Sequence, residues 1–227
     1  MAQPSDRGDS EPKSDHEWAI VRMIDNDLRG RGISDERVLE AMRRVPRHLF
    51  VLPSEEWRAD EDRALQIGWG QTISQPYVVA ATMAALRIRP DARALDVGTG
   101  SGYAAAVMAE LGAEVYSIER IPELADIARE NLRAAGCDHV QVTVGDGSLG
   151  IPEHAPYDCI AVAAAAPEIP PALMDQMADG GRMVIPIGPP RLQDLVLVER
   201  RGSEYDRQVL FGCAFVPLLG EEGWTGS

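Results

Sequence analysis

The stretch Leu95-Asp96-Val97-Gly98-Thr99-Gly100-Ser101-Gly102-Tyr103 decides the fold of this chain. It follows an apolar run that predicts a strand over residues 93–97, and it opens a predicted helix over 102–111. Glycines at such a turn let the backbone bend sharply and approach a ligand, while the helix N-terminus offers free N–H groups. Taken alone, this G-x-G-x-G loop is consistent with a nucleoside-bearing cofactor or with a tight turn that has no further function.

Three better-known loops do not fit the same residues. A dinucleotide loop, G-x-G-x-x-G, requires its third glycine where Tyr103 stands. A P-loop ends in Gly-Lys-Ser/Thr, which is absent here, and a nucleophile elbow requires glycine in place of Thr99. The loop therefore disfavours an NAD-dependent oxidoreductase, a P-loop nucleotidase and an α/β-hydrolase.

Beyond residue 92, short apolar strands alternate with helices. This alternation predicts a mostly parallel sheet covered by helices on both faces. Only the turn Arg201-Gly202-Ser203-Glu204 separates the last two strands, so an antiparallel pair is expected at the end of the sheet. The expected strands are residues 93–97, 114–118, 140–144, 158–163, 182–187, 194–200 and 209–216, and the expected helices are 102–111, 122–135 and 170–178.

Before this core, apolar spacing predicts a helix over residues 17–28, a second helix capped by Ser34, and a third over 75–86. Residues 46–70 show no periodicity and are expected to form a long loop, a type of segment that is often functional. We divide the chain into a disordered leader (1–15), N-terminal helices with an active-site loop (16–90), a core (91–223) and a tail (224–227), all within a single compact domain.

Composition excludes several classes of function. With 22 lysines and arginines against 36 acidic residues, the net charge is −14, which disfavours binding to nucleic acid. No run of 18 apolar residues predicts a membrane span, and the first residues lack the apolar segment of a signal peptide. The three dispersed cysteines, Cys137, Cys159 and Cys213, predict neither disulfides nor a metal cluster. We expect a metal-free monomer in the cytoplasm.

Two acidic residues beyond the glycine loop narrow the choice of ligand. Glu119 ends the second strand, where a carboxylate can accept both hydroxyls of a ribose. Asp146 ends the third strand, where it can accept a hydrogen bond from an adenine amino group while Gly147 leaves room for the ring. Each acid alone is equally consistent with an ordinary charge at a strand end. Together with Asp96, they lie at the carboxyl ends of consecutive parallel strands, where open α/β sheets bind ligands.

The cofactor that suits these residues carries no phosphate, because no basic residue is expected beside the loop to meet a pyrophosphate. A ribose, an adenine and a positive centre without phosphate describe S-adenosylmethionine, whose spent form is S-adenosylhomocysteine. The expected fold is therefore a Rossmann-like class I S-adenosylmethionine-dependent methyltransferase, with a seven-stranded, mostly parallel sheet, helices on both faces and an N-terminal helical extension.

Longer stretches of the chain resemble the protein-L-isoaspartate O-methyltransferases. The glycine loop is shared with many methyltransferases, but Gly70-Gln71-Thr72-Ile73-Ser74-Gln75-Pro76 and Ala166-Pro167-Glu168-Ile169-Pro170 are far more specific. The resemblance runs from about Arg47 to Gly223, roughly three quarters of the chain. It implies methylation of the free carboxylate of L-isoaspartyl (and D-aspartyl) residues, which begins the repair of damaged peptides and proteins.

The resemblance also implies a role for individual residues. Ser74 and Thr72 match the catalytic positions, and Ser74, Val216, Pro217 and Leu218 match the substrate-binding positions. Cofactor contacts are implied for Gln71, Thr72, Ile73, Ser74, Gln75, Asp96, Gly98, Thr99, Gly100, Gly102, Glu119, Arg120, Asp146 and Gly147.

The chemistry is consistent with a serine at the centre of the site. A carboxylate with a pKa of about 4 is already ionised at neutral pH, so no strong general base is required. The Ser74 hydroxyl can donate to one carboxylate oxygen and leave the other free to attack a methyl group. No lysine or arginine lies within residues 66–80 to hold the attacking oxygen. Ser74 is also open to interpretation as a helix N-cap before Pro76.

Three departures from the family pattern leave the substrate open. Gln66 replaces a frequent proline, Ala59 or Asp60 stands where an aromatic residue is common, and Ala163 replaces the usual threonine. These changes permit a related enzyme that methylates an aspartate in a dedicated biosynthetic peptide. A non-catalytic S-adenosylmethionine-binding regulator is an alternative of another class. A nucleic-acid methyltransferase is disfavoured, because no Asn/Asp-Pro-Pro-Tyr motif follows the fourth strand.

Overall fold

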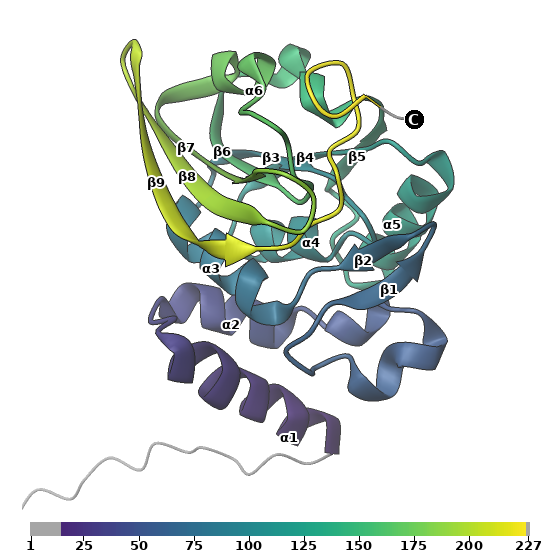
Figure 1. The fold of residues 1–227 in the computed structure, drawn as a ribbon. Coiled ribbons are helices and arrows are strands. Elements are labelled where there is room, and N and C mark those ends of the chain that lie inside the picture. Colours follow the sequence, from purple (N-terminus) through teal and green to yellow (C-terminus); the bar gives the residue numbers. More distant parts are fainter. Residues whose placement is uncertain (1–14, 226–227) are drawn as a thin grey trace, which may run out of the picture.

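A seven-stranded sheet with the order β5-β4-β3-β6-β7-β8-β9 forms the centre of the structure, a computed structural model that describes residues 15–225 (Figure 1). The first five strands in this order run parallel, whereas β8 runs antiparallel to both of its neighbours. The expected sheet and its antiparallel end are thus confirmed. The strands are β3 (Arg93–Val97), β4 (Glu114–Glu119), β5 (Gln141–Val144), β6 (Tyr157–Val162), β7 (Met177–Ile187), β8 (Gln193–Arg201) and β9 (Glu204–Cys213).

Helices cover both faces of this sheet, as its apolar strands require. Along β3, Ala94 packs into one hydrophobic cluster and Leu95 and Val97 into another, because successive side chains point to opposite faces. The first cluster includes residues of α3 (Pro76–Leu86), α4 (Tyr103–Glu110) and α5 (Pro122–Ala134). The second includes Leu173 of α6 (Pro171–Asp175), which lies across the opposite face (Figure 1).

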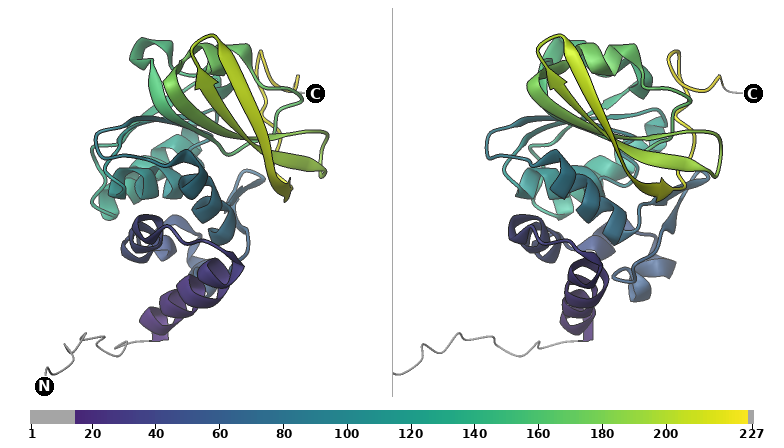
Figure 2. Two further views of the ribbon diagram at one scale, coloured as in Figure 1. Left: turned by 90° about the vertical axis from the view of Figure 1, so that its left-hand side faces the viewer. Right: turned by 60° about the vertical axis from the view of Figure 1, so that its left-hand side comes forward.

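The N-terminal extension lies against the outer side of the α3–α4 layer, away from the sheet (Figure 2). It contains α1 (Asp15–Arg22), the π-helical η1 (Met23–Leu28), the short 3-10 helix η2 (Arg29–Arg31) and α2 (Glu36–Arg44). The expected helix over 17–28 is therefore present, although its second half follows the wider π-helical path. Gly32 follows η2 and ends this helical stretch with a left-handed φ of +96°.

Asp35, and not Ser34, caps α2. The Asp35 carboxylate accepts hydrogen bonds from the backbone N–H groups of Arg37 (3.0 Å) and Val38 (3.4 Å). Both residues have side chains suited to an N-cap, so the one-residue error came from the choice between two adjacent candidates.

The expected long loop over 46–70 is wrong for much of its length. The chain forms the 3-10 helices η3 (Arg47–Phe50) and η4 (Pro53–Arg58), and then β1 (Leu65–Gly68), which pairs antiparallel with β2 (Gln71–Ile73). These elements are too short to produce a periodic pattern. A tight turn at Trp69-Gly70 joins β1 to β2, and Trp69 is half exposed there with a φ of +48°.

Near the C-terminus, two elements differ from their expected bounds. The helix expected over 170–178 ends at Asp175, because the chain from Met177 joins β7, where Met177 pairs with Tyr157. Strand β9 begins at Glu204, five residues before the expected start, because its pairing with β8 continues as far as the turn between the two strands.

Of the two expected ends of the chain, the leader lies almost wholly outside residues 15–225, and the tail lies half outside them. The leader (1–15) overlaps the described residues only at Asp15, which opens α1. Of the tail, Trp224 donates its indole N–H to the carbonyl of Ala165 at 3.0 Å. None of the helices within the described part of the chain combines the length and the apolar character that a bilayer crossing demands.

Replacing Asp35 with alanine removes the side-chain cap of α2. We expect Asp35→Ala to lower the free energy of unfolding by about 1 kcal/mol. Ser34→Ala is the matched control and should change it by less than about 0.5 kcal/mol, since surface substitutions away from such features have small effects. Urea unfolding followed by circular dichroism measures both, and an equal loss in the two variants would contradict the assignment of the cap.

Candidate active site

The glycine loop leaves β3 with three left-handed residues, Gly98, Gly100 and Gly102, whose φ angles are +86°, +55° and +98°. Side chains other than glycine rarely adopt these angles, so the sequence of the loop follows from its shape. Gly102 lies directly before α4. The loop is tied to β4 by the N–H of Gly98, which donates to the carbonyl of Ile118 at 2.9 Å.

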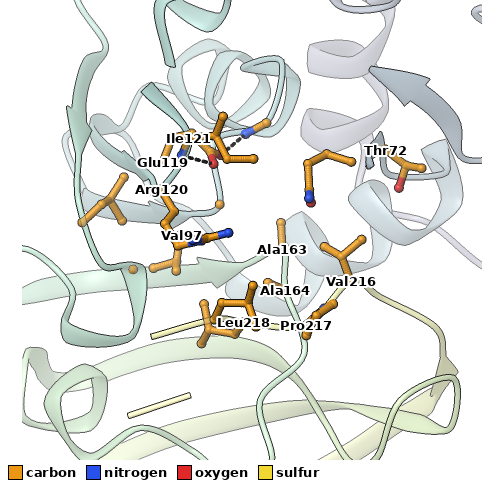
Figure 3. Close-up of a pocket in the computed structure, with 16 residues that line it drawn as sticks. Thr72, Val97, Glu119, Arg120, Ile121, Ala163, Ala164, Val216, Pro217 and Leu218 are labelled. Atoms are coloured by element: carbon orange, nitrogen blue, oxygen red, sulfur yellow. Dashed lines mark hydrogen bonds between the residues drawn. The ribbon is translucent and has the colours of Figure 1, made fainter. Parts of the chain in front are cut away.

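Glu119, the last residue of β4, is 7% exposed and binds backbone on both of its oxygens. Oε2 accepts from the N–H of Gly100 at 2.9 Å, and Oε1 accepts from the N–H of Ile121 at 3.0 Å (dashed in Figure 3). These two bonds fix the carboxylate at the edge of the sheet. Because a carboxylate oxygen has more than one lone pair, Glu119 can still accept hydrogen bonds from a ligand.

A cavity, here called the glycine-loop cavity, opens beside this carboxylate. Figure 3 shows Glu119 and Arg120 on one side of it and Thr72 and Val216 on the other. Gly147 forms part of its wall, where an added Cβ would lie 2.7 Å from Val97 Cγ1. The lining residues are Gln71, Thr72, Val97, Gly98, Gly100, Ile118, Glu119, Arg120, Ile121, Gly147, Ala163, Ala164, Val216, Pro217, Leu218 and Leu219.

A second cavity, here called the Ser74 cavity, adjoins the first. The two share three lining residues, Thr72, Ala163 and Val216. The ionisable side chains in the lining of the Ser74 cavity are those of Arg31, Tyr77 and Cys213. The full lining is Arg31, Ala64, Thr72, Ser74, Gln75, Tyr77, Val78, Ala163, Phe211, Gly212, Cys213, Ala214, Phe215 and Val216.

Ser74 lies between β2 and α3, and it does not cap α3. The residue at the N-cap is Gln75, which makes no side-chain cap. The carboxylate of Asp62 instead accepts the N–H of Tyr77 at 2.8 Å and the side-chain amide of Gln75 at 2.8 Å. The interpretation of Ser74 as a helix cap is therefore wrong, and its hydroxyl is available to the cavity.

Asp96 lies behind the glycine loop rather than in either cavity. It is fully buried, and its Oδ2 accepts from the hydroxyl of Ser117 at 2.6 Å. Burial raises the pKa of Asp96 to about 6, and the charge of Glu119 adds to this, although the hydrogen bond from Ser117 opposes it. Because Asp96 precedes Val97, which lines the cavity, the alternation of the strand turns its side chain to the other face.

Asp146 is likewise absent from the lining of the glycine-loop cavity. Its Oδ1 accepts from the N–H (2.9 Å) and the hydroxyl (2.7 Å) of Ser148, and its Oδ2 accepts from the N–H of Glu221 at 2.7 Å. Asp146 thereby pins the C-terminal segment to η5 (Gly147–Leu149). Gly220 passes so close that an added Cβ would collide with Asp146 Oδ1.

Most of the site residues expected from the sequence meet around these two cavities. Ser74 and Gln75 line the Ser74 cavity, and Thr72 and Val216 line both. The others in the glycine-loop cavity are Gln71, Gly98, Gly100, Glu119, Arg120, Gly147, Pro217 and Leu218. Ile73, Asp96, Thr99, Gly102 and Asp146 line neither cavity.

The sequence did not reveal every lining residue. The apolar side chains of Phe211 and Phe215 have no motif that distinguishes them from core residues. Arg31 comes from the N-terminal extension, far from any motif. Cys213 is half-buried in the Ser74 cavity, whereas Cys137 and Cys159 are buried, and all three are free thiols.

The residues of the glycine-loop cavity fit a nucleoside without phosphate, with one correction. Arg120 lines the cavity and is exposed, so the expectation that no basic residue lies beside the loop is wrong. Glu119 faces the same space, and its charge opposes that of a phosphate. Within residues 15–225, no group of three or more histidine, cysteine or acidic side chains is arranged to hold a metal ion.

A glycine loop after β3, an acid at the end of β4 and a parallel sheet extended by an antiparallel strand define the class I S-adenosylmethionine-dependent methyltransferase fold. Two solved structures extend this assignment. A protein-L-isoaspartate O-methyltransferase is 28% identical, with a TM-score of 0.80 over 92% of this chain and 67% of that one. A putative one from Plasmodium falciparum, in complex with S-adenosyl-L-homocysteine, is 26% identical, with a TM-score of 0.77 over 91% of this chain and 99% of that one.

Relatives in sequence are closer still. A protein-L-isoaspartate O-methyltransferase of Methanoculleus marisnigri is 55% identical over 90% of this chain and 93% of its own length. One from Marinobacter nauticus is 54% identical over 95% and 98%. The family model described as protein-L-isoaspartate(D-aspartate) O-methyltransferase matches residues 20–223. This chain belongs to that family, which confirms the resemblance found in the sequence.

The buried Asp96 carboxyl should make stability depend on pH. Its pKa is about 6 in the folded protein against 3.8 for an unperturbed aspartate, so between these values the folded state retains a proton that the unfolded state has lost. Stability should therefore fall as pH rises from about 4 to 6, by about 3 kcal/mol from this group. Asp96→Asn should flatten that fall.

Urea unfolding at pH 4, 5, 6 and 7 measures the difference between wild type and Asp96→Asn. Asp138→Asn provides a control, because it makes the same substitution at an exposed surface position. Parallel pH profiles of wild type and Asp96→Asn would contradict the expected titration.

Proposed function

We propose that this chain transfers a methyl group from S-adenosylmethionine to the free carboxylate of L-isoaspartyl residues in damaged peptides and proteins, as the first step of their repair. The observation that carries the proposal is the pair of adjoining cavities with Thr72, Ala163 and Val216 in their common wall. A donor in one cavity and an acceptor in the other would meet at this wall. The activity for which the family is named agrees with this arrangement.

The glycine-loop cavity is the proposed cofactor site. When bound, S-adenosylmethionine supplies a methyl group already activated by its positive sulfur. Glu119 holds a ribose through the lone pairs that its backbone bonds leave free, and Gly147 admits the flat base. Gln71, Thr72, Gly98, Gly100 and Arg120 also line this cavity. Further proposed contributors to the cofactor site lie behind it or in the neighbouring cavity: Ile73, Ser74, Gln75, Asp96, Thr99, Gly102 and Asp146.

Ser74 and Thr72 are the proposed catalytic residues. The Ser74 hydroxyl donates to one oxygen of the acceptor carboxylate and leaves the other oxygen to attack, while Thr72 lies in the common wall. No residue has to remove a proton, because the acceptor is already ionised. Alignment of the reacting groups is then the main contribution of the protein, and alignment can supply on the order of 7–11 kcal/mol.

The segment Val216-Pro217-Leu218 is the proposed contact for the bound peptide. It is held against the end of β6 by two hydrogen bonds: the N–H of Ala165 donates to Val216, and the N–H of Leu218 donates to Ala165, each at 2.8 Å. These bonds keep the segment beside both cavities. A short peptide with an extra backbone carbon at isoaspartate can pass along it into the Ser74 cavity.

Ala163 is the departure from the family pattern that bears on substrate choice. It lines both cavities, whereas Ala59, Asp60 and Gln66 line neither. A smaller residue at the common wall keeps a second candidate open, an enzyme that methylates an aspartate in a dedicated biosynthetic peptide. The non-catalytic alternative is disfavoured because Ser74 and Thr72 both face the Ser74 cavity.

We further propose that the enzyme acts as a monomer in the cytoplasm. A net charge of −14 favours the monomer through repulsion between copies. Its three free thiols agree with a reducing compartment.

A matched peptide pair tests the proposed activity. We expect methyl transfer to a peptide with one L-isoaspartyl residue and at least about 10²-fold slower transfer to its aspartyl twin, because the twin places its carboxylate at a different distance from the backbone. Transfer of radiolabelled methyl groups and release of methanol from the ester provide the measurement. Preference for the aspartyl peptide would favour the biosynthetic alternative, and cofactor binding without transfer to either would favour the regulator.

Ser74→Ala tests the catalytic assignment. Loss of the hydroxyl should lower kcat on the isoaspartyl peptide on the order of 10²-fold, as expected for a donor that orients a reacting carboxylate. The Kd of S-adenosylhomocysteine, measured by calorimetry, should change less than about threefold, because Ser74 does not line the glycine-loop cavity. Ser203→Ala, in the exposed turn between β8 and β9, is the control. Full turnover in Ser74→Ala would remove this residue from the mechanism.

A further inference from the structure

Arg47, the first residue of η3, is 1% exposed and makes all of its described hydrogen bonds to backbone carbonyls. Its guanidinium donates to the carbonyl of Ala59, to that of Arg63 at 3.2 Å and to that of Ser74 at 2.9 Å. One buried side chain thus joins the segment 59–63 to the residue proposed to hold the acceptor. A buried cation is costly, so its presence here points to a role that an apolar residue would not fill.

The position of Ser74 depends on such contacts, because it belongs to no regular element. Strand β2 ends at Ile73 and α3 begins at Pro76, so neither the strand ladder nor the helix fixes the intervening backbone. Arg47 binds the carbonyl of Ser74, and Asp62 binds the side chain of the next residue, Gln75. The segment 59–63 is thus linked to Ser74 through Arg47 and to Gln75 through Asp62.

Arg47 also lies near the start of α4. Its guanidinium carbon lies 5.6 Å from the ring centroid of Tyr103, the first residue of α4, which directly follows Gly102. The same side chain thus lies between Ser74 and the helix that follows the glycine loop. The planar fork of a guanidinium can bridge several carbonyls at fixed angles, whereas a lysine ammonium presents a single point of charge.

We propose that Arg47 is a positioning residue for Ser74, whose carbonyl it holds so that the Ser74 hydroxyl meets the acceptor carboxylate. This inference rests on the proposed function, since it requires Ser74 to contact the acceptor. Arg47 touches neither substrate, because it lines neither cavity. Its proposed effect on turnover passes through Ser74, whose carbonyl it binds.

A double-mutant cycle between Arg47→Lys and Ser74→Ala tests the inference. Arg47→Lys keeps the charge but cannot reproduce the three bonds, and we expect kcat on the isoaspartyl peptide, at saturating cofactor and peptide, to fall at least about tenfold. In the Ser74→Ala background the same change should cost less than about twofold, because the group that it positions is gone. A residue with a purely structural role would slow both backgrounds equally.

Arg37 offers a matched control. Its guanidinium also bridges two backbone carbonyls, those of Ile88 (2.7 Å) and Leu111 (2.8 Å), but it lies away from both cavities. Arg37→Lys should keep kcat within about twofold of wild type, even if the melting temperature of the variant falls.

Asp62→Asn provides a second variant, which weakens the contact with Gln75 next to Ser74. We expect Asp62→Asn to lower kcat in the wild-type background and to change it little in the Ser74→Ala background, as for Arg47→Lys. If Arg47→Lys does not fold, Asp62→Asn tests the inference alone.

The outcomes of the cycle distinguish the positioning role of Arg47 from the catalytic role of Ser74. Equal losses in both backgrounds, or a loss that excess cofactor restores, would overturn the inference while leaving the proposed function intact. Normal turnover in Arg47→Lys and Asp62→Asn together with slow Ser74→Ala would do the same. Normal turnover in Ser74→Ala would overturn both the role of Ser74 and the inference built on it.

Discussion

The carboxylate of Glu119 joins the two parts of the chain on which the site depends. By accepting the N–H of Gly100, it ties the glycine loop after β3 to the end of β4, and by accepting the N–H of Ile121 it fixes the start of α5. Without this carboxylate, the N–H of Gly100 would lose its partner at the edge of the sheet. The same carboxylate faces the cavity, so one side chain both shapes the loop and presents an acceptor to a ligand.

The core of the fold could be predicted because its signals are local and repeat. Seven apolar strands, three glycines at a strand-to-helix turn and an acid at the next strand end suffice to specify the sheet and its loop. The errors occur where elements are short or neighbours compete. Strand β1 has only four residues, and Asp35 stands beside another good cap in Ser34. The strand position of Asp96 predicts a cofactor contact, and its buried side chain, bonded to Ser117, lines neither cavity.

The Ser74 cavity was harder to predict because its walls come from distant parts of the chain. Arg31 arrives from the N-terminal extension and Phe211 from the last strand, while Ser74 lies between them in the short link from β2 to α3. No local sequence pattern predicts that these distant residues line one cavity. The buried Arg47 shows the same limit, because an arginine in a short helix suggests an exposed charge until the carbonyls around it are known.

The backbone N–H groups of Glu221 and Glu222 donate to Asp146 and Ser148, and these bonds bear on how the cavity forms during synthesis of the chain. They anchor the last described turn of the chain, next to the wall formed by Val216, Pro217 and Leu218. A nascent polypeptide that has emerged only as far as β8 already contains the glycine loop, yet it lacks this wall. The wall of the cavity at Val216, Pro217 and Leu218 is therefore anchored only once residues 221 and 222 have reached Asp146 and Ser148.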